Sequence, residues 1–283
     1  MTALVAIVGS ANLDVVLSVS RRPDAGETVM GSGYVEVSGG KGANQAIASG
    51  RVARSTFIGS VGRDGAARHL EQALHSAGVE LDYLVRSDLP TGRAFITLTP
   101  EGENSIVVMA LANSTLTASA VIAALDSARP TLVLTQLEVP AAVTVAIVEW
   151  CSRTGTRFVL NPSPVQGLPH GAIEIADPLI VNQVEARALL GVDADDAQLA
   201  SALAKRCRSV VLTAGSRGAF VGSGGVIEHI TGENVSVVDT TGAGDAFAGT
   251  LAAHLALGAT LVDAASVANK EAARLIQLTR TDR

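Results

Sequence analysis

The sequence predicts an α/β fold in which a mostly parallel sheet is flanked by helices and carries a small antiparallel β lid. Short β-rich runs alternate with helical patterns along most of the 283 residues, which is the order of a parallel sheet with crossover helices. These runs lack polar alternation, as expected for strands covered on both faces. Two segments, 14–37 and 90–110, interrupt the order with strand-like patterns and no intervening helix. They predict the lid, and 1–13, 38–89 and 111–283 predict the core.

The individual elements follow from the same patterns. The core strands are expected at Leu4–Val8, Thr56–Ser60, Leu132–Thr135, Phe158–Asn161, Leu179–Asn182 and Val210–Thr213. Helices are expected at Ala43–Val52, Asp64–Ala77, Ala141–Arg153, Glu185–Leu190 and Val262–Leu278. The lid strands are expected at Val15–Val19, Phe95–Thr99 and Ser105–Met109, and a further strand-like run lies at Val235–Val238.

Composition and charge restrict the class of protein. Hydrophobic residues make up 48% and charged residues 17%, so the chain is neither disordered nor fibrous. Its length allows a substantial core in one large domain, with or without a smaller appendage. The net charge of −6 argues against a general affinity for nucleic acid or anionic lipid. Any bound phosphate must therefore be held by local geometry and a metal.

The sequence favours a cytoplasmic protein without a membrane partner. No basic flank precedes the apolar run Leu4–Val8, so a signal peptide is not expected. The uncharged stretch Ala246–Val262 is interrupted by two glycines and a histidine and is too short for a membrane span. Cys151 and Cys207 share no metal or redox spacing, which indicates two reduced thiols.

The segment Asp239–Phe247 combines a turn of small residues with the start of a helical pattern. Small residues at Thr240–Gly244 allow a sharp turn that presents consecutive N–H groups at a helix start, where anions bind. An acid inside such an anion hole suits a base that deprotonates a hydroxyl beside a bound phosphate, which is the role expected for Asp245. The alternative is a glycine-rich helix start with an Asp favoured by the helix dipole.

Two polar segments lie near the predicted C-terminal ends of strands, where an open parallel sheet binds ligands. Asn12 and Asp14 have alternate spacing, so both side chains can face one side and bond adjacent hydroxyls. In Gly39–Asn44 the glycines let the backbone approach a ligand, and Lys41 and Asn44 offer polar contacts. The alternatives are ordinary loop residues and a solvated lysine in a glycine turn. No P-loop is present, and no G-x-G-x-x-G follows a predicted strand.

Two of these segments carry a family resemblance. Asp239–Phe247 resembles the C-terminal signature of the ribokinase-like (PfkB-type) carbohydrate kinases, and Gly39–Ala46 resembles their N-terminal signature. Weaker similarity occurs at 9–14, 23–28, 101–104, 161–164 and 213–218. The resemblance implies a three-layer sandwich and ATP- and Mg²⁺-dependent phosphorylation of the primary hydroxyl of a sugar, most closely ribose. The alternatives are deoxyribose, another sugar, a nucleoside such as pseudouridine, or a catalytically impaired sugar-binding member.

The resemblance also implies roles for single residues. It makes Asp245 the catalytic base and gives the anion hole to Gly242, Ala243 and Gly244. It implies a sugar site built from Asn12, Asp14, Gly40, Lys41, Asn44, Glu138 and Asp245. It implies nucleotide contacts from Asn182, Thr213, Gly215, Gly218, Gly244 and Asn269. Chemistry alone favours a surface acid for Glu138, and the alternative for 213–218 is a plain hairpin turn.

Metal sites and assembly are implied in the same way. Glu185, three residues after Asn182, would organise Mg²⁺ through water, although the same pattern is a helix capping box. Asp239 and Thr241 match one side of a monovalent-cation site. The helix Val262–Leu278 runs into 279–283 without the glycine-containing segment that supplies the other side. We therefore expect K⁺ activation to be weak or absent. A homodimer through the lid is also implied.

Overall fold

The computed structural model describes residues 3–100 and 103–282, so residues 101–102 of the predicted lid and the weak similarity there lie outside the described residues. In that part of the chain, nine strands form one sheet in the order β15-β14-β13-β12-β11-β10-β1-β4-β6. Seven of them pair in parallel: β1 (Val5–Val8), β4 (Ser55–Ile58), β6 (Val79–Glu80), β10 (Leu132–Thr135), β11 (Arg157–Leu160), β12 (Ala176–Asn182) and β13 (Ser209–Thr213). The remaining two strands, β14 (Ala219–Ser223) and the edge strand β15 (Val226–Ile230), pair antiparallel at one side of the sheet.

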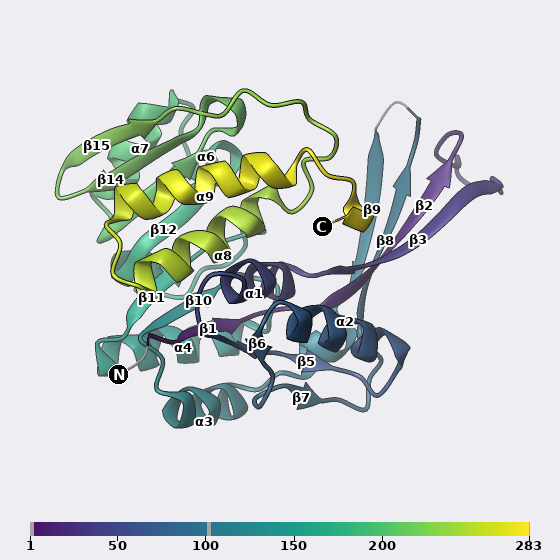
Figure 1. The fold of residues 1–283 in the computed structure, drawn as a ribbon, viewed down its shortest axis with the longest axis horizontal. Coiled ribbons are helices and arrows are strands. Elements are labelled where there is room, and N and C mark those ends of the chain that lie inside the picture. The colour runs from purple at the N-terminus through teal and green to yellow at the C-terminus, as the bar shows by residue number, and fades with distance from the viewer. Residues whose placement is uncertain (1–2, 101–102, 283) are drawn as a thin grey trace.

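Helices cover both faces of this sheet (Figure 1). One layer packs on the face of Val5 and Ile7 and comprises α1 (Lys41–Gly50), α2 (Gly65–Ser76), α8 (Ala243–Ala256) and α9 (Leu261–Leu275). The other packs on the face of Ala6 and Val8 and comprises α3 (Ala118–Ala128), α4 (Ala141–Thr154), α5 (Ala172–Ile175), α6 (Gln183–Leu190) and α7 (Asp196–Ala204). Alternate residues of β1 thus enter opposite cores, which is why its sequence is apolar throughout. The predicted three-layer α/β sandwich is confirmed.

The order of the strands fixes where a ligand can bind. β1 lies between β4 and β10, so the chain runs outward from β1 in both directions across the sheet. In an open parallel sheet, the crevice at such a reversal lies beyond the carboxyl ends of the strands. The segments that follow β1 and β10, which contain Asn12 and Glu138, meet at this end of the sheet.

A second, four-stranded sheet forms the lid and projects beyond the core (Figure 1). Its order is β3-β2-β8-β9, with β2 at Asn12–Val19, β3 at Gly31–Gly39, β8 at Gly92–Leu98 and β9 at Asn104–Met109. Both outer pairs are antiparallel, whereas the central pair β2–β8 is parallel because its strands come from separate segments of the chain. Two further short strands, β5 (Ser60–Val61) and β7 (Val85–Arg86), pair in parallel.

Three details differ from the sequence-based expectations. Val235–Val238 is not a strand: Val237 and Val238 are exposed, and the Val238 N–H donates to the Ile276 carbonyl at 2.8 Å. The β-branched valines gave a strand pattern, but none of the described strands pairs with them. The sequence also did not predict the β14–β15 edge hairpin or β3.

Within the described residues, no helix is both long and apolar enough to cross a bilayer.

Candidate active site

The turn before α8 has the geometry expected of an anion hole. Gly242 is the N-cap of α8 with a φ of 76°, a left-handed conformation that glycine adopts without strain. The Ala243 N–H donates to the Thr240 carbonyl at 3.2 Å, and the Ala246 N–H to the Gly242 carbonyl at 2.8 Å. Amides at the first turn of a helix point toward its positive end, so this turn can stabilise an anion.

Asp245 lies in the first turn of α8 and is buried. Asn44 Nδ2 donates to its Oδ2 at 3.2 Å, and Gln45 Nε2 donates to its Oδ1 at 3.0 Å. Burial raises the pKa of Asp245, while the charge of Lys41 and the two amide hydrogen bonds oppose that rise. A carboxylate with a raised pKa that is fixed from α1 has the properties of a general base.

Gln45 is held by a buried amide network that sequence reasoning did not identify. Its Nε2 also donates to Asn161 Oδ1 at 3.1 Å, and its Oε1 accepts from Gln136 Nε2 at 2.5 Å. Asn161 Nδ2 in turn donates to the Ile180 carbonyl at 3.0 Å. The network therefore ties α1, β10, β11 and β12 to the oxygen of Asp245 that Gln45 contacts. The one available signal was the polar Gln45 inside an otherwise small and apolar helix pattern.

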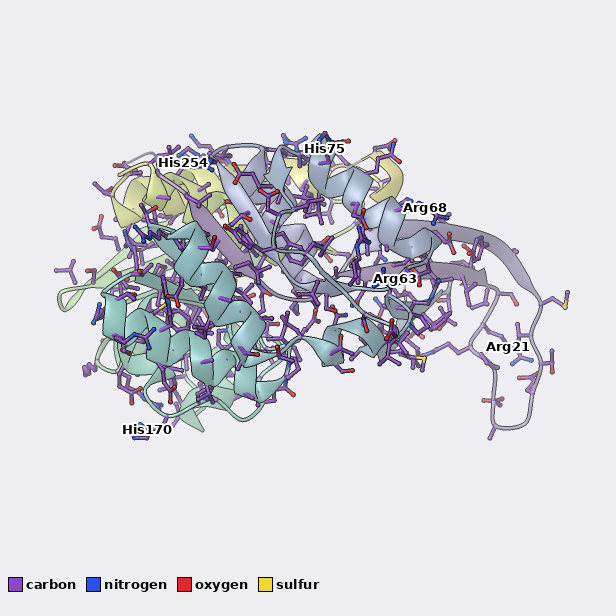
Figure 2. The ribbon with its side chains drawn as sticks, turned by 90° about the horizontal axis from the view of Figure 1, so that it is seen from below. Arg21, Arg63, Arg68, His75, His170 and His254 are labelled. Atoms are coloured by element: carbon purple, nitrogen blue, oxygen red, sulfur yellow. The ribbon has the colours of Figure 1, made fainter. Side chains whose placement is uncertain are left out.

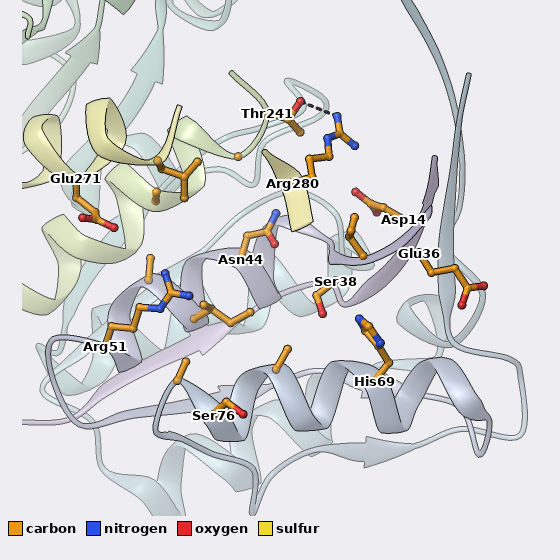
Figure 3. A pocket seen from close by; sticks show the side chains of 18 residues that line it. Asp14, Glu36, Ser38, Asn44, Arg51, His69, Ser76, Thr241, Glu271 and Arg280 are labelled. Carbon is orange, nitrogen blue, oxygen red and sulfur yellow. Dashed lines mark hydrogen bonds between the residues drawn. The ribbon is translucent and has the colours of Figure 1, made fainter. Parts of the chain in front are cut away.

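A cavity of about 440 Å³ opens between the lid and the helices α1, α2 and α9 (Figure 3). Asp14, Asn44, Gly242 and Arg280 are among its lining residues. Burial raises the pKa of Asp14 to about 6; the charge of Arg280 opposes that rise, and Glu138 and Asp245 add to it. A Cβ at Gly39 would lie 2.1 Å from Asp14 Oδ1, so only glycine leaves room for this carboxylate.

Three other residues predicted for the sugar site, Asn12, Gly40 and Glu138, are not among the lining residues of this cavity. Asn12 is buried, and its Oδ1 accepts from Asn113 Nδ2 at 2.8 Å. Glu138 Oε2 accepts from Ser10 Oγ at 2.5 Å and from the Lys41 N–H at 3.1 Å. Gly40, the N-cap of α1, has a φ of 84°. Lys41, also predicted for the sugar site, lines a second cavity rather than the first.

The second cavity, of about 390 Å³, lies beyond β12 and β13. It brings together four of the six residues predicted for the nucleotide, Asn182, Thr213, Gly215 and Gly244. It is also lined by residues predicted for other roles: Lys41, Glu185, Gly242 and Asp245. Gly242 lines both cavities, and Asp245 receives hydrogen bonds from the wall of the first. The two cavities therefore meet at the turn that carries Asp245.

Two residues predicted for the nucleotide are placed elsewhere. Gly218 packs against backbone, since a Cβ there would lie 2.0 Å from the Ile230 carbonyl oxygen. Asn269 is on α9, where its Nδ2 donates to the Thr231 carbonyl at 3.2 Å. The segment 213–218 also forms the turn of the β13–β14 hairpin, so the hairpin turn given as the alternative for this segment is observed.

The metal candidates are bonded within the protein. Asn182 and Glu185 form a capping box in which each side chain accepts the other residue's N–H at 2.9 Å. Arg280 Nε donates to Asp239 Oδ2 at 2.8 Å, and its Nη2 donates to Thr241 Oγ1 at 2.7 Å. Among the described residues, no group of three His, Cys, Asp or Glu could hold a metal. Three of the histidines, His75, His170 and His254, lie far apart on the outside of the molecule (Figure 2).

Comparisons with known proteins decide the family. The model of the pfkB family of carbohydrate kinases matches residues 2–282. A ribokinase of Staphylococcus aureus is 34% identical, with 98% of this chain and 94% of that protein covered. A ribokinase of Bacillus subtilis is also 34% identical, with 95% and 91% covered.

The chain belongs to the pfkB family of carbohydrate kinases. Its fold agrees with this membership. The solved structure of Arabidopsis thaliana ribokinase in complex with ribose and ATP superimposes with a TM-score of 0.88 at 27% identity, covering 98% of this chain and 93% of that one. The sugar-kinase class expected from the two glycine-rich segments is thereby confirmed.

Proposed function

We propose that this pfkB-family kinase transfers the γ-phosphoryl group of ATP to the primary 5-hydroxyl of ribose. The observation that carries the proposal is the position of Asp245, at the junction of one cavity lined by Asp14 and Asn44 and another lined by Asn182 and Thr213. Similarity to ribokinases over nearly the whole chain supports ribose as the sugar.

In this proposal each group at the junction has one task. Asp245 takes the proton of the sugar hydroxyl, whose oxygen attacks the γ-phosphorus while the bond to the β–γ bridging oxygen breaks and ADP leaves. The N–H groups of Gly242 and Gly244 stabilise the charge that develops on the transferring group, and the Ala243 N–H joins them when it exchanges its 3.2 Å bond to the Thr240 carbonyl for the phosphoryl oxygen. Asp14 and Asn44 hold the sugar hydroxyls, and Gly40 and Glu138 shape that side.

The nucleotide side follows the second cavity. Asn182, Thr213, Gly215 and Gly244 contact the nucleotide, and Lys41 faces the phosphates rather than the sugar. Besides the proposed base Asp245, Glu185 is the one carboxylate among the described residues that line this cavity, and so sparse a set fits a Mg²⁺ held mostly through water. When bound, Mg²⁺ neutralises charge on the phosphates during transfer.

We propose a homodimer through the lid, formed by residues 14–37 and 90–110. A row of four aligned apolar residues crosses all four lid strands: Val35, Val16, Ile96 and Ile106. Asp14 and Val16 are two residues apart on β2, so this row shares the face of Asp14. Val16 and Ile96 in the middle of the row are already buried in one copy, whereas Val35 and Ile106 at its ends are 39% and 51% exposed, and a second copy would cover these two.

A cytoplasmic location belongs to the same proposal, because ATP is the co-substrate and Cys151 and Cys207 are free thiols.

The proposal is tested by ADP release measured with pentoses, hexoses and nucleosides at fixed ATP and Mg²⁺. We expect the highest kcat/KM with ribose and a product phosphorylated at the 5-position by NMR. A higher kcat/KM for a hexose or a nucleoside would contradict ribose as substrate. No ADP release with any acceptor would contradict the kinase reaction itself.

A further inference from the structure

The guanidinium of Arg280 lies where the family resemblance places a monovalent cation. Asp239 Oδ1 accepts from the Thr241 N–H at 2.8 Å, which closes the turn on itself. Arg280 Nε then donates to Asp239 Oδ2 at 2.8 Å. Its Nη2 donates to Thr241 Oγ1 at 2.7 Å (Figure 3). The side chain therefore bridges both residues that the sequence assigned to the cation site.

With Arg280 in this position, the same residues cannot also bind a monovalent cation. A hard cation must replace its hydration shell with several fixed oxygens. Here Asp239 Oδ2 and Thr241 Oγ1 already accept charge-assisted hydrogen bonds, and Arg280 brings a permanent positive charge to the same place. A second cation would be repelled at this distance and would have to displace the arginine.

The ion pair is well shielded. The side chain of Arg280 is 18% exposed and that of Asp239 is 26% exposed. Although burial raises the pKa of Asp239, hydrogen bonds from Thr241 and Arg280 outweigh that rise and hold the pKa below its usual value. The pair is thus charged on both sides at neutral pH, and it is shielded more than a surface pair.

The turn that Arg280 holds leads directly into the site. Gly242 begins α8 one residue after Thr241, and Asp245 follows in the first turn of the same helix. The backbone on the other side is fixed too, since the Val238 and Asp239 N–H groups donate to the Ile276 carbonyl at the end of α9. Arg280 adds the side-chain connection between this end of α9 and the anion hole.

We propose that Arg280 is a positioning residue whose guanidinium replaces the monovalent cation and fixes the anion-hole turn, so that this kinase does not depend on K⁺. This inference rests on the proposed phosphoryl transfer at that turn. The arginine acts through the turn: it stabilises the backbone that carries the N–H donors and Asp245.

The test compares the wild type with Arg280→Ala in tetramethylammonium, K⁺ and guanidinium salts at constant ionic strength. We expect wild-type kcat to change less than about twofold between tetramethylammonium and K⁺. In tetramethylammonium, the kcat of Arg280→Ala should be roughly 10- to 100-fold lower than that of the wild type, which is the loss expected when catalytic groups are slightly displaced. K⁺ or guanidinium should restore part of this loss in a saturable manner. Arg280→Lys keeps the charge but not the planar guanidinium, so its kcat should lie between those of the wild type and Arg280→Ala.

Thermal unfolding gives a readout that does not require turnover. K⁺ and guanidinium should raise the Tm of Arg280→Ala and leave the Tm of the wild type unchanged, because only the variant has an open cation position. The matched control is Arg274→Ala, which removes an exposed arginine of α9 bonded to Glu271 and should behave like the wild type.

Three results would overturn the inference: a several-fold saturable activation of the wild type by K⁺, an Arg280→Ala variant with wild-type kcat in tetramethylammonium, or a variant Tm that no cation changes. If Arg280→Ala does not fold, the same measurements on Arg280→Lys decide. A wild type that phosphorylates no sugar contradicts the proposed function, while the Tm comparison still tests the cation replacement.

Discussion

Asp245 combines burial with hydrogen bonds from two amides, so its substitution tests its role as base with little change of shape. Asp245→Asn keeps the volume and removes the basicity. We expect kcat to fall by roughly 10²–10⁴, the usual range for loss of a general base. The new amide keeps its oxygen toward Gln45, and a turn of the Asn44 amide lets Asn44 Oδ1 accept from the new NH2 group, so sugar affinity by calorimetry and the Tm should stay near those of the wild type. A variant that retains more than about half of wild-type kcat, with chemistry rate-limiting, would rule out this assignment.

Asp14 makes sugar binding sensitive to pH. Its pKa is raised to about 6, and only the ionised carboxylate accepts hydrogen bonds with both oxygens. Below that pH the protonated form increases, so the Kd for sugar should rise about tenfold between pH 7 and pH 5. Calorimetry without nucleotide measures this directly. Asp14→Asn should bind more weakly at pH 7 and show no such dependence; a wild-type Kd that is flat over this range would contradict the role of Asp14.

The same carboxyl should lower stability at neutral pH. Because its folded pKa of about 6 exceeds the ordinary 3.8, its contribution to stability is fully present below about pH 3.8 and is lost as the pH rises through 6. At pH 8 the half-buried ionised group therefore destabilises the fold. Asp14→Asn should increase the free energy of unfolding by about 1–2 kcal/mol at pH 8, after allowance for solvent screening, and by much less at pH 4.5. Urea unfolding at both pH values measures the difference, and an equal effect at both would contradict it.

At the scale of single elements, α6 contains a side chain, that of Glu185, with both a structural role and a proposed functional role. Glu185 Oε2 accepts the Asn182 N–H in the capping box, and the residue also lines the second cavity. The start of α7 has the same box with Gln198 in the matching position, where its Oε1 accepts the Asp195 N–H at 3.3 Å. A glutamine at position 185 can therefore still cap α6.

This equivalence separates the two roles of Glu185. Glu185→Gln should leave the Tm within about 1 °C of wild type, since the cap persists, and should raise the Mg²⁺ concentration for half-maximal rate several-fold. Glu185→Ala, the control that removes the cap, should also lower stability by about 0.5–2 kcal/mol. An unchanged Mg²⁺ dependence in Glu185→Gln would leave Glu185 with the structural role alone.

The elements that could be predicted from sequence are those whose burial is uniform. Leu132–Thr135 was predicted at the observed bounds of β10 because it is buried on both faces. The β14–β15 hairpin was missed because its exposed outer strand gives no apolar pattern. Val235–Val238 was misassigned because β-branched residues favour strands, yet here the Val238 N–H donates to the Ile276 carbonyl at the end of α9.

The parts of the site that lie within short local motifs could be predicted from the sequence. Asp245, Asn44 and the turn at Gly242 lie within two short segments, and the fold brings them together as expected. The bonds from Gln45 to Asn161 and from Arg280 to Asp239 join residues far apart in the chain. Such contacts depend on how the helices pack on the sheet, which no local pattern encodes.

At the scale of the whole molecule, the lid is the part of the described structure that a single copy leaves least covered. Every residue of β9 is exposed, including Ile106, Val107 and Val108. Exposed apolar side chains grouped on a sheet are typical of an interface. The row that contains Ile106 shares the face of Asp14, so a partner on that face would also enclose the sugar.

Alternation along β9 supplies a matched pair of variants for this dimer. Ile106 belongs to the row on the Asp14 face, whereas the adjacent Val107 lies on the opposite face and is exposed to a similar degree, 62% against 51%. Ile106→Lys would bury an unpaired charge in the interface and should give a monomer by light scattering, with a several-fold weaker Kd for ribose. Val107→Lys adds the same charge to the other face and should remain dimeric with wild-type affinity. A monomeric wild type, or equal loss of dimer in both variants, would contradict an interface on the face of Asp14.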